Sequence, residues 1–163
     1  MKKILFVMLM AIVSLTTAIA QNEGVRFTSK ETGITFRVPS NCKLIQDDVQ
    51  AIIIQTPDKQ YTITAEPFNV EKATQDEITA HMRERSVAAG MDLTKLDKID
   101  NTTTNVTLIA QGYDFPNGAA AVVGVAVVNQ TELAFYITVV AGPDYTDMAA
   151  TTLATIDFNP DAI

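Results

Sequence analysis

His81 is the only histidine of the chain, and its charged neighbours offer the clearest chance of chemistry. Glu77 precedes it by four residues and Arg85 follows it by four. Residues at i and i+4 lie on the same face of a helix, so Glu77 and His81 could share a metal ion. A transition-metal site needs three or four ligands, and the chain has one cysteine and no second histidine. We therefore expect an exposed helix position supported by charge pairs, and no metal or cofactor.

A group of oxygen ligands lies further along the chain. Asp97, Asp100 and Asn101 offer the oxygen atoms that calcium prefers. Their spacing does not match an EF-hand loop, and Lys98 lies among them. The sequence favours a solvated acidic loop at this place over a calcium site.

Cys42 is the only cysteine, and a thiolate is a strong nucleophile when a base activates it. His81 would have to be that base, and nothing in the sequence places the two residues together. The chain has no Gly-x-Ser-x-Gly elbow, no glycine-rich phosphate loop and no dinucleotide-binding fingerprint. We predict no catalytic residue. A small secreted hydrolase that uses His81 with carboxylates stays open as an alternative.

The first twenty residues have the three regions of a secretory signal peptide. Lys2 and Lys3 are basic, and residues 4–13 form an unbroken apolar run. Ala18-Ile19-Ala20 matches the small-x-small pattern that signal peptidase accepts. The apolar run is shorter than the roughly 20 residues that a membrane-spanning helix needs. We predict that residues 1–20 are a signal peptide and that the protein is periplasmic or secreted.

Cleavage between Ala20 and Gln21 would leave a single domain over residues 21–163. It removes two of the 12 basic residues and none of the 19 acidic ones, which gives a formal charge of −9. An acidic surface disfavours nucleic acid and anionic membranes as partners. Cys42 lies 22 residues after Ala20, so it cannot carry the lipid of a bacterial lipoprotein. We expect no membrane anchor after processing.

Alternating apolar residues predict four strands in the first half of the chain, at 25–27, 34–38, 51–55 and 61–65. Thr74 and Glu77 form the pattern of a capping box, which predicts the start of a helix. Gly90 supplies a left-handed stop, so this helix covers about 75–89. Residues 91–104 have little periodicity and are typical of a connecting loop.

Three further strands are predicted at 105–113, 119–128 and 133–140, followed by a helix at about 145–155 with Asp144 as its cap. The last two strands are apolar at consecutive positions. An antiparallel sheet with one face in water should alternate instead. We therefore predict an α+β fold in which helices cover both faces of an antiparallel sheet, an α/β/α sandwich.

Tyr113 and Phe115 lie beside the predicted turn Pro116-Asn117-Gly118. They offer a small aromatic contact surface at a hairpin tip. Such residues more often form the edge of a core, and we favour that interpretation.

Phe27, followed by a short gap and by Gly33-Ile34-Thr35-Phe36-Arg37-Val38-Pro39-Ser40, resembles the opening of the PsbP-like superfamily. That superfamily includes photosystem II PsbP, Mog-type Ran-binding proteins and bacterial exported proteins. Its usual start is an aromatic residue and then Gly-x-x-Phe-x-x-Pro. The order of predicted elements and the terminal Ile156-Asp157-Phe158 also fit.

The resemblance implies a non-enzymatic accessory or binding role, with partners that differ widely among members. We therefore expect a non-catalytic exported binding or accessory protein of the bacterial envelope, with an unknown protein or small ligand as its partner. Besides the hydrolase, a self-associating structural subunit stays open, for example through edge pairing of residues 25–28.

Overall fold

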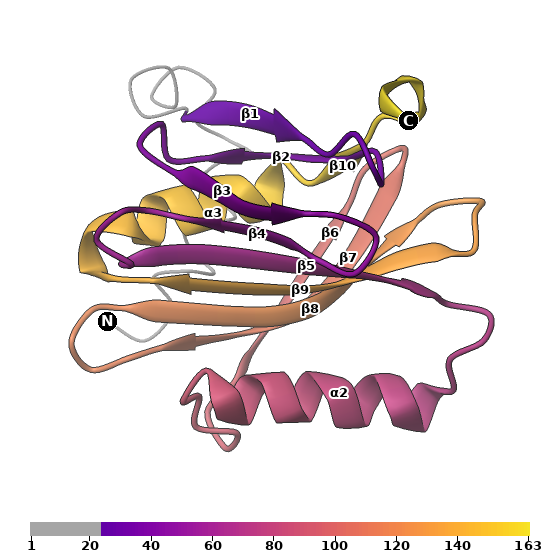
Figure 1. Cartoon of the computed structure of the whole chain (residues 1–163). Helices are drawn as coiled ribbons and strands as arrows, with labels where there is room; N and C mark the ends of the chain where they lie inside the picture. Colours follow the sequence, from indigo (N-terminus) through magenta and orange to yellow (C-terminus); the bar gives the residue numbers. More distant parts are fainter. Residues whose placement is uncertain (1–23) are drawn as a thin grey trace.

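Two antiparallel sheets and two helices form the part of the chain that the computed structural model describes, residues 24–163 (Figure 1). The larger sheet has the strand order β3-β4-β5-β9-β8-β7-β6, and the smaller one has the order β1-β2-β10. The predicted cleavage point between Ala20 and Gln21 lies outside the described residues.

The strands of the larger sheet are β3 (Lys43–Asp47), β4 (Ile52–Gln55), β5 (Tyr61–Asn69), β6 (Asp97–Thr102), β7 (Val106–Asp114), β8 (Ala120–Val128) and β9 (Leu133–Ala141). The smaller sheet has β1 (Val25–Thr28), β2 (Ile34–Val38) and β10 (Asp157–Phe158). The helices are α2 (Gln75–Ala88) and α3 (Thr146–Ala154), and the 3-10 turns are η2 (Pro143–Tyr145) and η3 (Pro160–Ala162).

The main core lies between the larger sheet, α3 and the smaller sheet. Buried residues of β2, β5, β8 and β9 meet Leu153 of α3 in one apolar cluster. Threonine hydroxyls fix α3 along β2. Thr152 Oγ1 donates to the carbonyl oxygen of Arg37 at 2.7 Å, and the Arg37 N–H donates to Thr155 Oγ1 at 3.0 Å. These hydroxyls therefore give Arg37 hydrogen-bond partners opposite the segment that precedes the short β10.

Helix α2 begins as the sequence predicts. The hydroxyl of Thr74 accepts from the N–H of Glu77, and the Glu77 carboxylate accepts from the N–H of Thr74, which completes the capping box. Gly90 follows the helix with a φ of 77°, as a left-handed stop requires. Asp144 is not the cap of α3. It lies in η2, and the N-cap residue is Tyr145, which makes no side-chain cap bond.

Strand β8 is buried on both of its faces. Val122 and Val123 are each 1% exposed, and neighbouring side chains of a strand point to opposite faces. Val122 belongs to the main core with Leu153. Val123 belongs to a second, smaller cluster that Met82 of α2 joins. The apolar run of 119–128 therefore corresponds to a central strand with cover on each side.

The predicted α+β class and antiparallel sheet are confirmed, but full helical cover of both faces is not. Helix α2 lies along one side of the larger sheet (Figure 1), and Ser86 is its only fully buried residue. Ile109 and Val140 pair with Val125 and Ala121 on the same face as Val123, and both are exposed. Part of this face is therefore open.

Two strands differ from the sequence-based expectation. β3 was not predicted, because a register shift between Leu44 and Gln46 breaks its alternation. β6 occupies a segment for which the sequence favoured a loop. It is an edge strand in which only Ile99 is buried, so its pattern shows little apolar periodicity.

Replacing either Val122 or Val123 with aspartate should destabilise the protein severely. Each change leaves an unpaired charge in an apolar site, and we expect a loss of at least about 3 kcal/mol in the free energy of unfolding. Urea denaturation of the two variants measures the loss in the free energy of unfolding, and Ile109→Asp, at an exposed position, is the control. If the Val123→Asp variant melts like the control, α2 does not cover this face.

Candidate functional site

The candidate site lies where α2 meets the open part of the larger sheet. Glu66 of β5 and Tyr136 of β9 are paired in register, so their side chains emerge side by side on one face. His81 and Arg85 lie one turn apart on α2, on the face that approaches these strands. All four residues are partly buried.

Glu66 is the centre of the polar contacts. Its Oε2 lies 3.3 Å from Nε2 of His81, and its Oε1 accepts from Nη2 of Arg85 in an ion pair. Nε of Arg85 lies 3.4 Å from the same His81 nitrogen. Both carboxylate oxygens therefore have a partner on the helix. This arrangement joins α2 to β5.

Aromatic rings extend the contact onto β9. The ring of Tyr136 stacks on Phe68, with centroids 4.1 Å apart and planes 14° apart. The Tyr136 ring also packs on the His81 ring, with centroids 4.0 Å apart. Burial, followed by the Glu77 and Glu66 carboxylates, raises the pKa of the Tyr136 hydroxyl. The phenol is therefore neutral at physiological pH and packs as an aromatic group.

The predicted pairing of His81 with Glu77 is wrong. Glu77 is engaged in the capping box, where the N–H and hydroxyl of Thr74 donate to its Oε2 at 2.8 and 3.0 Å. These bonds lower the pKa of the Glu77 carboxyl. The expected exposed position of His81 is also wrong, because its ring is half-buried against Tyr136.

The sequence did not single out Glu66 or Tyr136. A charged residue directly after the alternating run 61–65 is the one available signal. The pairing with His81 depends on how α2 crosses the sheet, which local patterns do not encode.

The acidic residues that could have bound calcium do not converge. Asp97 and Asp100 are three positions apart in β6, so their side chains point to opposite faces. Asp100 instead pairs with Lys98, with Nζ and Oδ2 3.2 Å apart. Within residues 24–163, no three histidine, cysteine, aspartate or glutamate side chains are grouped so that they could hold a metal ion.

Cys42 lies away from His81, against the main core. Burial raises the pKa of its thiol to about 11, and the nearby Asp58 carboxylate adds to the shift. The thiol is therefore protonated at neutral pH. In the described part of the chain, the hydrogen-bond partners of His81 are Glu66 and Arg85, so the structure brings no serine or cysteine nucleophile to it.

Tyr113 and Phe115 form the edge of the smaller apolar cluster, as the favoured interpretation predicted. Their rings meet edge to face with centroids 4.8 Å apart, and both pack near Met91. None of the helices over residues 24–163 is long and apolar enough to cross a membrane.

No protein-family model and no curated protein matches the chain. Solved structures do. The structure of the Ran-binding protein Mog1p of Saccharomyces cerevisiae is 10% identical, with a TM-score of 0.47, over 77% of this chain and 90% of Mog1p. Cyanobacterial PsbP from Synechocystis is 8% identical, with a TM-score of 0.49, over 83% of this chain and 92% of that PsbP chain. The chain is similar to PsbP and Mog1p.

A crystal structure from Bacteroides thetaiotaomicron is 13% identical, with a TM-score of 0.47, over 86% of this chain. The chain spans about half the length of that structure. Mog1p and PsbP represent two of the protein groups named in the resemblance of the sequence. Similarity at this level carries no information on activity.

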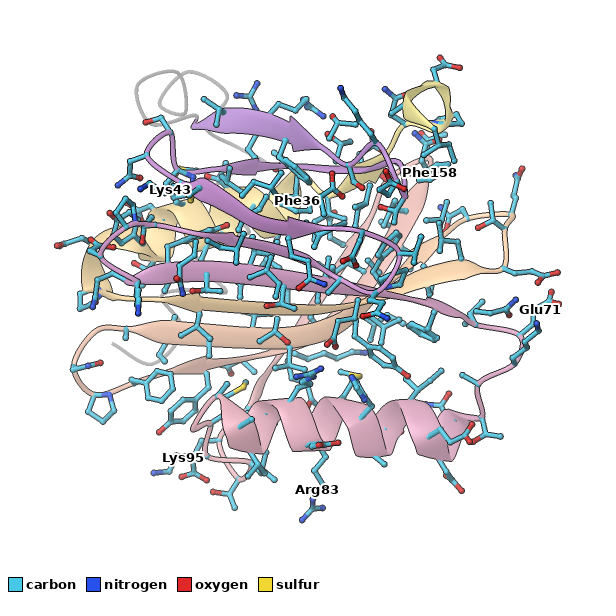
Figure 2. The ribbon with its side chains drawn as sticks, viewed as in Figure 1. Phe36, Lys43, Glu71, Arg83, Lys95 and Phe158 are labelled. Atoms are coloured by element: carbon cyan, nitrogen blue, oxygen red, sulfur yellow. The ribbon has the colours of Figure 1, made fainter. Side chains whose placement is uncertain are left out.

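Replacing His81 with alanine should lower the free energy of unfolding by about 0.5 to 1.5 kcal/mol, because the ring contact with Tyr136 and the contact with Glu66 are lost. Arg83 is the matched control. It lies two residues away and points away from the sheet (Figure 2), so Arg83→Ala should change stability by no more than about 0.5 kcal/mol. Chemical denaturation of both variants measures this. Equal stability of the two variants would contradict a structural role for His81.

Proposed function

We propose that the protein is a non-catalytic, exported binding or accessory protein of the bacterial envelope. The observation that carries this proposal is the state of its only histidine. His81 is held by Glu66 and Arg85 and packs on Tyr136. A histidine in these contacts joins a helix to a sheet. A general base would instead need a nucleophile or a substrate at its ring, and within residues 24–163 no serine or cysteine side chain lies within hydrogen-bond distance of His81.

Export is the second part of the proposal. It rests on the basic start, the apolar run and the Ala-x-Ala end of residues 1–20. The net negative charge of residues 21–163 favours a protein or a small ligand as the partner over nucleic acid.

An α/β/α layering is the third part of the proposal. The clusters on the two sides of β8 support a helical layer on each face, with α3 on one and α2 on the other.

The protein should be exported and cleaved after Ala20. N-terminal sequencing of the mature protein from an expressing bacterium should begin at Gln21. A mature protein that keeps residues 1–20, or one that stays in the cytoplasm, would contradict the envelope location.

Capture of a partner tests the binding role. The tagged, exported protein is used to retain proteins from envelope extract, and mass spectrometry identifies them. We expect the same partner to be retained by the parent protein and by His81→Ala. If the parent hydrolyses a member of an ester, peptide or glycoside panel and His81→Ala does not, the protein is the hydrolase.

A further inference from the structure

The two edges of the larger sheet differ in how they are protected. At one edge, β6 carries the exposed ion pair of Lys98 and Asp100, and charges on an edge strand discourage pairing with other chains. At the other edge, β3 exposes Leu44 and Ile45, which are 53% and 60% accessible. β3 has charged residues only at its two ends, Lys43 and Asp47, and a register shift beside Ile45, so the exposed centre of this edge is apolar.

β3 has a strand neighbour on one side only. It pairs with β4, and the strand that precedes it in the chain, β2, belongs to the smaller sheet. Within residues 24–163, the backbone of 43–47 makes no hydrogen bond with an element other than β4. An edge of this kind offers backbone donors and acceptors whose natural complement is another extended chain.

Further exposed apolar side chains lie close to this edge along the chain. Val49, in the turn after β3, is 72% exposed, so Leu44, Ile45 and Val49 expose three aliphatic side chains within six positions. Single exposed apolar residues are ordinary on a protein surface, whereas a contiguous group is typical of an interaction site.

Two carboxylates lie at the end of this apolar surface. Asp47 accepts a bond from the Ser29 hydroxyl at 2.6 Å. Asp48 accepts from two backbone N–H groups of the following turn and from Gln46, and these bonds lower the pKa of its carboxyl. Neither aspartate forms an ion pair with a cation among the described residues. The negative charge at this end complements a basic side chain.

We propose that β3 is the docking edge for an extended, basic segment of a partner protein, which adds as a further strand beside it. Apolar side chains of the segment would cover Ile45, and a lysine or arginine would lie near Asp47 and Asp48. This inference rests on the proposed binding role and names the surface and the partner chemistry for it.

A second copy of the chain fits this edge less well. Lys43 is opposite Gln55 and Asp47 is opposite Ile52, three positions apart, so the register shift places the two charged side chains on opposite faces of the sheet. Two β3 strands paired antiparallel therefore cannot bring each Lys43 against the other copy's Asp47. The net negative charge of each copy also opposes their association.

The probe is the peptide acetyl-Lys-Val-Thr-Ile-Thr-Val-Lys-amide, titrated against the purified exported protein. One control peptide has both lysines replaced by glutamate, and another has methyl groups on alternate backbone nitrogens, which remove its strand donors. We expect the basic peptide to bind at least tenfold more tightly than either control and to slow hydrogen exchange over residues 43–47.

Ile45→Lys should weaken binding of the basic peptide at least tenfold. Ile109→Lys is the matched control, since Ile109 is 52% exposed on the inner strand β7, and it should bind like the parent. Thermal melts of both variants establish that they are folded. Absence of binding, equal binding of the acidic peptide, or protection at β1 or β6 in place of β3 would each overturn the proposal.

Two further outcomes separate this inference from the proposed function. If the envelope partner is still captured by Ile45→Lys, the β3 edge is not the docking surface, although the binding role stands. If sedimentation shows a dimer of the parent that Ile45→Lys abolishes, the occupant is a second copy and the proposal of a foreign segment fails.

Discussion

The fold depends on one constraint, which is that β8 must be kept from water on both of its faces. Its residues are apolar at consecutive positions, and Val122 and Val123 are both buried. The main core with α3 covers one side, and the cluster that Met82 of α2 joins covers part of the other. A sheet covered on one side alone would leave Val123 and its neighbours exposed, so the position of α2 matters to the whole domain.

The apolar packing of α2 on the sheet involves partly buried side chains such as Met82. The helix buries only Ser86 completely, and His81 and Arg85 lie on the face that approaches the sheet. Glu66 receives both of them, and Tyr136 packs on the histidine ring. In this account the only histidine of the chain serves to join a helix to a sheet. The proposed non-catalytic role rests on this arrangement, and the surface that we propose for a partner is the exposed β3 edge.

Local patterns predicted the elements that are regular and deeply packed. The alternation of 34–38 and 61–65, the capping box at Thr74 and the apolar run of 119–128 each correspond to an element in the structure. β3 and β6 were missed because edge strands carry exposed and charged residues and, in β3, a register shift. The candidate site was misassigned for a related reason. The neighbours of His81 along the helix are visible in the sequence, whereas Glu66 reaches it only through the tertiary arrangement.

The most direct test of the central claim is a double-mutant cycle between Glu66 and Arg85. The free energy of unfolding is measured by urea denaturation for the parent, Glu66→Ala, Arg85→Ala and the double variant. If this contact fixes α2, the two changes should be coupled by about 1 kcal/mol. The same cycle between Glu66 and Arg83, which points away from the sheet, should be additive within about 0.3 kcal/mol. Equal additivity in both cycles would show that Glu66 does not hold the helix and would contradict the account.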